Sequence, residues 1–194
     1  MPIGLRFGFQ SGMCLFFMLS SYLITELLLR ERATTGRVHI EAFFIRRILR
    51  IWPLYFACLA LAVITGFIWT NFRFPLRCLA AYLLLAGNWY NVLIGRVDSP
   101  WQPLWSINVE EQFYLLWPFL ARASVRYLWA VSIATFPIAA LALAYWAGKV
   151  TDGPYGIPIW FNSFVQFQYF GLGAYSLSFY AAEYRPFLSD SDVS

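Results

Sequence analysis

The chain has 194 residues, of which 60% are hydrophobic, 21% aromatic and only 12% charged. Soluble domains carry about 25% charged residues, so this composition excludes an ordinary water-soluble fold and indicates a membrane protein. The net charge is +4, but we find no DNA- or RNA-binding motif. We therefore expect the basic residues to face the lipid bilayer or an anionic ligand, and we expect no nucleic-acid partner.

Apolar runs predict the membrane helices, because a helix needs about 20 apolar residues to cross the hydrocarbon core. The runs lie at residues 11–29, 51–70, 76–94, 103–121, 127–147 and 158–181. We predict an all-α fold, namely a single polytopic transmembrane bundle over residues 1–194 with about five to six membrane helices. One alternative stays open for residues 76–94, which can also re-enter the membrane or lie along its surface.

The segment between the first two apolar runs is rich in arginine. The positive-inside rule therefore places it in the cytoplasm. Within the first run, Ser20 and Ser21 are small residues that allow a neighbouring helix to approach closely or to bond to its backbone. The arginines of the basic segment are Arg30, Arg32, Arg37, Arg46, Arg47 and Arg50.

A basic cluster lies in FFIRRILRIWPLY, residues 43–55. On a helix, Arg47 and Arg50 are three positions apart and share a face, and Arg46 lies four positions before Arg50. Guanidinium groups bind phosphate oxygens bidentately, so the cluster predicts a site for a phosphate-rich ligand such as a coenzyme A thioester. The alternative is that these arginines flank a membrane span and reach lipid phosphates.

A pair of carboxylates interrupts the apolar segment WSINVEEQFYLLWP, residues 105–118. An ionised carboxylate costs roughly 2.5–3.5 kcal/mol in the bilayer centre, so it is expected to face a cavity or a partner. Phe113, Tyr114 and Trp117 follow Glu110 at helical spacing, which makes Glu110 a candidate general acid or base with aromatic walls. Glu111 points about a hundred degrees away on a helix, so the two acids need not act together.

Two structural alternatives explain Glu110 without catalysis. The carboxylate can form an ion pair with an arginine of another helix, or it can stabilise a helix start. In the second case, Ser106 or Asn108 would supply the helix cap.

Metal chemistry is not indicated by the sequence. Cys14, Cys58 and Cys78 are scattered and form no metal-ligand spacing, so we interpret them as packing residues. His39 is the single histidine and lies in the basic segment, where we expect it to be a solvated loop residue. We therefore predict no metal site.

Three segments resemble, in order and spacing, the acyltransferase-3 family of integral membrane O-acyltransferases. They are GMCLFFMLSSYLITELLLRE, FFIRRILRIWPLYF and PLWSINVEEQFYLLWPFL. The resemblance covers the chain from about Gly12 to Tyr180. It implies transfer of an acyl group, often acetyl, from acyl-CoA to a hydroxyl of a carbohydrate or lipid-linked glycan. It also implies a multi-pass protein of the bacterial inner membrane that holds no resident cofactor.

The resemblance also implies roles for individual residues. The arginine pair of the family corresponds to Arg47 and Arg50, so these two residues, together with Arg46, would bind the donor. Glu110 would be the catalytic acid of the tryptophan-serine motif, and Trp105 and Ser106 would shape its surroundings.

The sequence departs from the family pattern at several points. Cys14 stands where an aspartate is usual, and Ser21 stands where a glycine is usual. The family's first helix and its histidine have no counterpart here, and the apolar runs end after the sixth. We therefore expect a piece of a family member that lacks the first helix and the C-terminal helices.

Two other functions stay open at this point. In a transporter or permease fragment, Glu110 would couple proton or substrate movement, as intramembrane acids often do. In a structural fragment, the chain would pack against a full-length relative and perform no chemistry.

Overall fold

The computed structural model describes residues 3–68, 75–95, 99–147 and 159–180. Within these ranges every regular element is a helix, which confirms the all-α prediction. The helices in chain order are α1 (Ile3–Thr35), α2 (Ile40–Ile68), α3 (Leu76–Leu83), α4 (Gly87–Leu93), η2 (Gln102–Leu104), α5 (Trp105–Ala123), α6 (Val125–Ala147), η3 (Ile159–Phe161) and α7 (Ser163–Tyr180).

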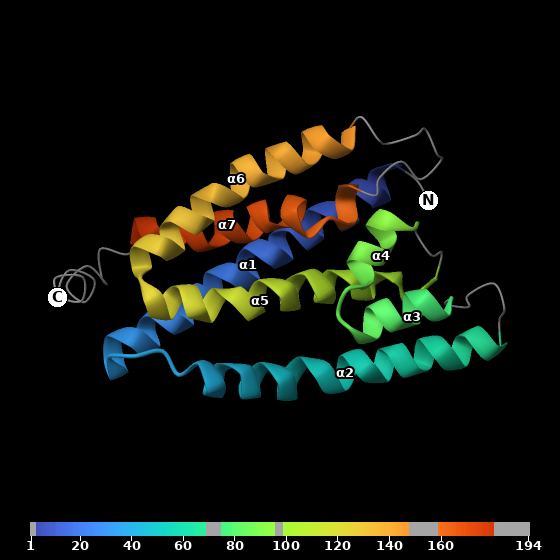
Figure 1. Ribbon diagram of the computed structural model, residues 1–194, viewed down its shortest axis with the longest axis horizontal. Helices are drawn as coiled ribbons and strands as arrows, with labels where there is room; N and C mark the ends of the chain where they lie inside the picture. Colours follow the sequence, from blue (N-terminus) through green and yellow to red (C-terminus); the bar gives the residue numbers. More distant parts are fainter. Residues whose placement is uncertain (1–2, 69–74, 96–98, 148–158, 181–194) are drawn as a thin grey trace.

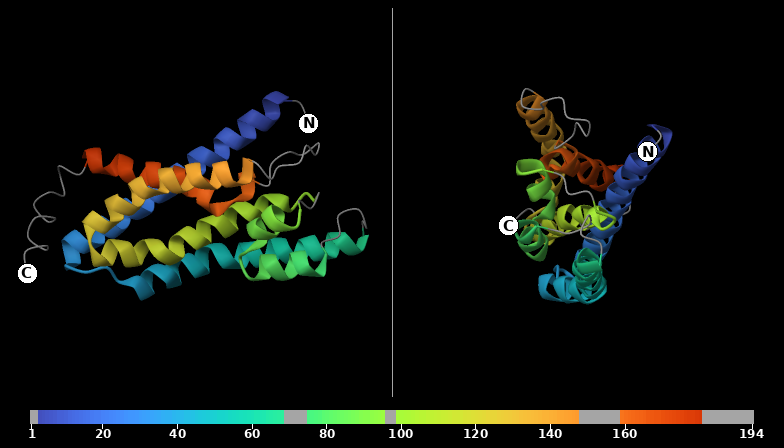
Figure 2. Two further views of the ribbon diagram at one scale, coloured as in Figure 1. Left: turned by 45° about the horizontal axis from the view of Figure 1, so that its top comes forward. Right: turned by 90° about the vertical axis from the view of Figure 1, so that its right-hand side faces the viewer.

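The long helices lie lengthwise beside one another, and the short α3 and α4 lie near one end of the bundle (Figure 1). The end-on view in Figure 2 shows α5 near the middle, with α2 on one side and α6 and α7 on the other. This central position explains why α5 buries residues around much of its circumference, from Trp105 to Ala121.

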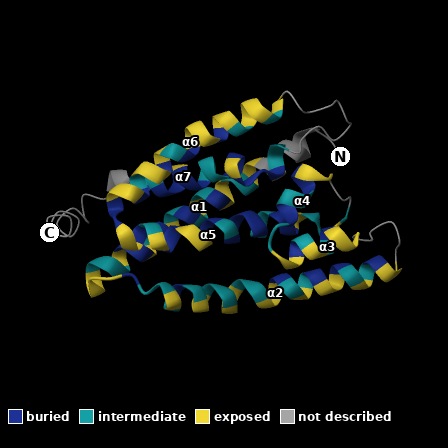
Figure 3. Ribbon diagram, viewed as in Figure 1, coloured by how far each residue is buried: buried dark blue, intermediate teal, exposed yellow. Residues whose placement is uncertain are grey.

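Three helical segments are long and apolar enough to cross a membrane, namely Ser11–Thr35, Ile40–Ile68 and Val125–Ala147. Large apolar side chains such as Leu49, Leu54 and Leu141 are exposed on these segments. The exposed residues gather on the outward faces of α2 and α6 (Figure 3). An apolar outer surface of this extent needs lipid to cover it, so the chain is an integral membrane protein. The total number of crossings stays a prediction.

The prediction that residues 76–94 form a single membrane-crossing helix is wrong. The segment forms α3 and α4, which have 8 and 7 residues. At 1.5 Å per residue, each is only about 12 Å long or less, whereas the hydrocarbon core is about 30 Å thick. The chain turns between them at Leu85, whose φ of 55° is unusual for a residue other than glycine. Gly87 follows, and a Cβ at this position would overlap the ring of Tyr82.

Each of the other predicted runs corresponds to one long helix whose bounds differ by several residues, and the fourth and last runs also include residues of the short helices η2 and η3. The second run begins at residue 51 in the prediction, whereas α2 begins at Ile40 and includes the whole arginine cluster. The ends of the second and last runs, at residues 69–70, 158 and 181, lie outside the described residues.

Close packing of α1 against α7 depends on small residues. A Cβ on Gly173 of α7 would collide with the Met18 carbonyl and the Ser21 hydroxyl of α1. The expected close approach of a helix is therefore confirmed at Ser21. Next to this contact, Phe17 stacks on Phe170 with ring centroids 4.7 Å apart.

Replacing Gly173 with alanine should therefore destabilise the bundle. Overpacking of this kind costs about 1–3 kcal/mol, so the thermal unfolding midpoint in detergent should fall by several degrees. The matched control is Gly12→Ala, because a Cβ there would meet nothing within 4 Å. An equal effect of the two substitutions would contradict this account of the α1–α7 contact.

Candidate active site

A groove of about 880 Å³ lies between α1, α2 and α5. Apolar side chains such as Leu23 and Leu54 form much of its wall. Its polar and charged lining residues come from all three helices and are Ser20, Glu26, Arg30, Arg47, Arg50, Tyr55 and Glu110. The groove thus joins the predicted carboxylate to two of the three predicted donor-binding arginines.

Glu110 lies at the inner wall of the groove and is only 5% exposed. Its Oε1 accepts a hydrogen bond from Ser20 Oγ at 2.5 Å, and the Tyr114 hydroxyl donates to the same oxygen. The hydroxyls of Ser20 and Tyr114 also contact each other. We call Ser20, Glu110 and Tyr114 the carboxylate cluster.

The two hydroxyl groups were not equally visible in the sequence. Tyr114 follows Glu110 by one helical turn, and its place on the aromatic stripe is confirmed, since Phe113, Tyr114 and Trp117 are all buried. Ser20 precedes Glu110 by 90 residues. The sequence indicated Ser20 only as a small residue for helix packing, and no spacing pattern linked it to the carboxylate.

Arg47 lies against the carboxylate cluster through an aromatic ring. Its guanidinium carbon is 4.8 Å from the centre of the Tyr114 ring and 5.6 Å from that of Phe43. Such cation–π contacts hold a guanidinium in place while leaving its N–H groups available to other partners. Arg50, three positions further along α2, lines the same groove.

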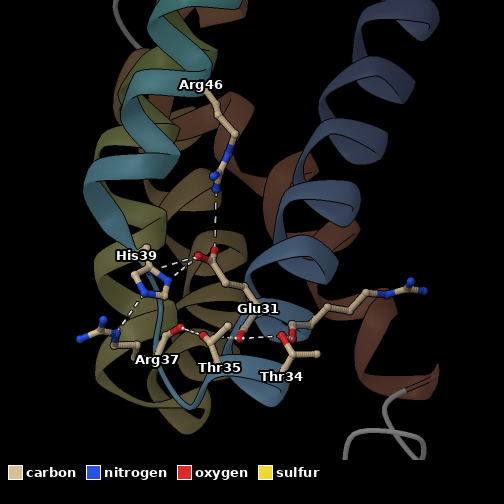
Figure 4. Close-up of polar contacts among 7 residues, drawn as sticks. Glu31, Thr34, Thr35, Arg37, His39 and Arg46 are labelled. Carbon is tan, nitrogen blue, oxygen red and sulfur yellow. Dashed lines mark hydrogen bonds and ion pairs between the residues drawn. The ribbon is translucent and has the colours of Figure 1, made fainter.

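Arg46 lies elsewhere. It is not among the described residues that line the groove, and its side chain is 56% exposed. Its Nη2 is 3.8 Å from Glu31 Oε2, at the cytoplasmic end predicted for α1 (Figure 4). The structure thus directs Arg46 to the end of α1, while Arg47 and Arg50 line the groove.

His39 lies in the loop between α1 and α2 and is partly exposed to solvent, as the sequence indicated, but its ring also has two polar partners. Its Nδ1 is 2.8 Å from Glu31 Oε1, and its Nε2 accepts a hydrogen bond from Arg37 Nε at 3.0 Å (Figure 4). Because Nε2 accepts, Nδ1 carries the proton that is donated to Glu31. These contacts, together with Arg46, tie the end of α1 to the start of α2.

Trp105 and Ser106 are not among the described residues that line the groove. Trp105 is buried and packs edge-on against Phe161, with ring centroids 4.9 Å apart. The Ser106 hydroxyl donates to the carbonyl of Pro103 at 2.9 Å. Both residues therefore stabilise the start of α5 in this structure.

The predicted helix cap at Ser106 or Asn108 is wrong. The N-cap of α5 is Leu104, whose aliphatic side chain cannot make a capping bond, and the short helix η2 runs directly into α5. Asn108 instead lies within α5, where its Oδ1 accepts a hydrogen bond from the Tyr55 hydroxyl at 2.8 Å.

The residues that follow Glu110 bind other helices. Glu111 Oε2 accepts a hydrogen bond from Trp52 Nε1 of α2 at 3.2 Å, which confirms that the two acids point apart. Gln112 donates to the Asn88 side chain of α4 and accepts from the Ser163 hydroxyl of α7. Gln112 was not among the predicted site residues, although a third polar residue in succession within an apolar helix is a usable signal.

Gln112→Leu should destabilise the bundle more than Gln168→Leu. The first change leaves several buried polar groups without a partner, at about 1–3 kcal/mol each. Among the described residues, Gln168 bonds to the Val165 carbonyl of its own helix and to no other helix, so the same substitution there should cost much less. Thermal unfolding midpoints in one detergent compare the two variants. A smaller loss for Gln112→Leu would refute the linking role of this side chain.

Cysteine and acidic side chains do not gather into a metal centre in the part of the chain that the structure describes. There, no group of three or more His, Cys, Asp or Glu residues could hold a metal ion. Cys14 and Cys58 are half-buried and Cys78 is buried, each as a free thiol.

The family model described as "Acyltransferase domain" matches residues 2–191, which confirms the resemblance found in the sequence. The chain is 34% identical over 116 residues to the peptidoglycan O-acetyltransferase OatA of Listeria monocytogenes. The aligned residues make up 55% of this chain and 19% of that protein. It is 33% identical over 118 residues to the O-acetyltransferase OatA of Staphylococcus aureus, again 19% of that protein.

The matched part of the chain thus spans about a fifth of the length of these curated relatives. No solved structure matches the chain.

Proposed function

Because the chain belongs to the acyltransferase-3 family of membrane proteins, we propose that it transfers an acyl group from acyl-CoA to a hydroxyl of a carbohydrate or lipid-linked glycan. One observation supports this function above the others: a single groove holds Arg47, Arg50 and the buried carboxylate of Glu110. The names of the relatives favour acetyl as the acyl group, with acetyl-CoA as the donor.

Arg47 and Arg50 would bind the phosphate groups of the donor. Guanidinium groups pair bidentately with phosphate oxygens, and Arg47 is already oriented by the Tyr114 ring. The apolar wall of the groove suits the uncharged arm that carries the thioester. In this arrangement the thioester carbonyl reaches Glu110 while the phosphates stay beside the arginines.

Glu110 would act as the general base of the transfer. It takes the proton of the attacking hydroxyl, whose oxygen then forms a bond to the thioester carbonyl carbon. The carbon–sulfur bond breaks, and the leaving thiolate takes the proton from Glu110. The hydrogen bonds from Ser20 and Tyr114 hold the carboxylate at the groove wall before the reaction.

The proposed location is the bacterial inner membrane, in a multi-pass arrangement. The basic segment from Arg30 to Arg50 favours a cytoplasmic position for the turn between α1 and α2. Arg30, Arg47 and Arg50 line the same groove, so its basic end faces the compartment that supplies acyl-CoA. The bacterial relatives support the choice of membrane.

Replacing both Arg47 and Arg50 with alanine should weaken donor binding by about 100-fold or more, since each arginine loses a hydrogen bond to a charged group that contributes about 1.5–3 kcal/mol. Equilibrium binding of radiolabelled acetyl-CoA to the protein in detergent measures the effect. Arg46→Ala is the matched control and should bind as the wild type does, because this side chain pairs with Glu31 outside the groove. Equal acetyl-CoA binding by the wild type, the double variant and Arg46→Ala would refute the proposal that Arg47 and Arg50 bind the donor.

Glu110→Gln should reduce acyl transfer by about 100-fold or more while donor binding persists, because a general base contributes about 10²–10⁴-fold. The assay follows label from acetyl-CoA into peptidoglycan glycan fragments. Glu111→Gln should keep most activity, since its partner is the Trp52 indole. Label that crosses sealed vesicles without forming an ester product would instead favour the transporter.

A further inference from the structure

The Ser20 hydroxyl and the Glu110 carboxylate, which bond to each other, both belong to residues that line the groove. Ser20 Oγ is 2.5 Å from Glu110 Oε1. The other hydroxyl on this carboxylate belongs to Tyr114, which is 1% exposed and is not among the described lining residues. Of the two hydroxyls, Ser20 is therefore the one that a molecule in the groove can reach.

A hydroxyl held against a carboxylate is the arrangement of an activated nucleophile and its base. We infer that Ser20 accepts the acyl group from the donor and carries it as an ester before the carbohydrate receives it. This inference rests on the proposed function and specifies that the transfer occurs in two steps at the same carboxylate.

In the first step, Glu110 takes the Ser20 hydroxyl proton and Oγ attacks the thioester carbonyl. The carbon–sulfur bond breaks, and the thiolate leaves with the proton from Glu110. In the second step, Glu110 takes a proton from the carbohydrate hydroxyl, whose oxygen attacks the serine ester. The carbon–Oγ bond breaks, and Ser20 regains its proton from Glu110.

The depth of Ser20 in the bundle gives a reason for a carrier. Ser20 lies ten residues before Arg30 on α1, which is about 15 Å along the helix, or about half of the hydrocarbon thickness. A small acyl ester is uncharged and suits the apolar wall around it. The ester can therefore hold the acyl group inside the bundle after the charged coenzyme A has left.

Tyr114 is a positioning residue in this scheme. Its hydroxyl donates to the same carboxylate oxygen, and its ring contacts the Arg47 guanidinium. Tyr114 therefore fixes the position of the Glu110 carboxylate relative to the Arg47 guanidinium. It stays buried, away from the groove, and is not itself acylated.

The test is acylation of the protein in the absence of any acceptor. The wild-type chain in detergent is mixed with acetyl-CoA labelled in the acetyl group, and free coenzyme A and protein-bound label are measured. We expect about one equivalent of each per chain. Peptide mass spectrometry should place a hydroxylamine-sensitive ester on Ser20.

Ser20→Ala should lose the bound label and acyl transfer but still bind acetyl-CoA, which shows that the variant is folded. Ser21→Ala is the matched control and should still be labelled, because that hydroxyl donates to the Met18 carbonyl of its own helix. Ser20→Cys should also be labelled, since a thiol can accept the acyl group. A merely structural role for Ser20 would not predict labelling of the cysteine variant.

Different failures separate the two proposals. Acyl transfer at the wild-type rate by Ser20→Ala, or label found on another residue, overturns the carrier and leaves the proposed function in place. A wild-type chain that binds acetyl-CoA but modifies neither itself nor an added glycan overturns both.

Discussion

The structure depends on hydrogen-bond partners for three consecutive polar residues at the middle of one helix, of which two are buried and the third is half-buried. Glu110, Glu111 and Gln112 of α5 lie in apolar surroundings, where an unpartnered polar group costs about 1–3 kcal/mol. Successive side chains point about a hundred degrees apart, so each must find its partner on a different helix. They find a hydroxyl of α1, an indole of α2 and an amide of α4. The same requirement therefore arranges the neighbouring helices and brings a hydroxyl to the carboxylate.

Helix α1 carries two adjacent serines that face different neighbouring helices, α5 and α7. Ser21 lies under Gly173 of α7, where only small atoms fit, and its hydroxyl is satisfied within α1. Ser20 faces α5 and donates to Glu110. The close contact with α7 fixes the rotation of α1, and that rotation in turn places Ser20 at the groove. Packing on one face of α1 thus determines the chemistry on another.

Sequence patterns predicted the features that depend on a single helix. Hydropathy indicated the apolar helices, and helical spacing predicted that Arg47 and Arg50 share a face and that Tyr114 accompanies Glu110. Averaged hydropathy could not reveal the turn at Leu85 within residues 76–94, because the backbone there reverses without any polar residue. It also could not connect Ser20 to Glu110, since that contact arises only when α1 packs on α5.

The partners of the arginines explain how the groove keeps two reactive kinds of group close together. A direct ion pair between Arg47 and Glu110 would neutralise both, leaving neither a free carboxylate for protons nor a free cation for phosphate. Instead, the Tyr114 ring separates their roles: its face supports the guanidinium, and its hydroxyl satisfies the carboxylate. The neighbouring Arg46 pairs with Glu31, so it secures the turn between α1 and α2. One short basic cluster thereby supplies both a structural contact and two cations that face the groove.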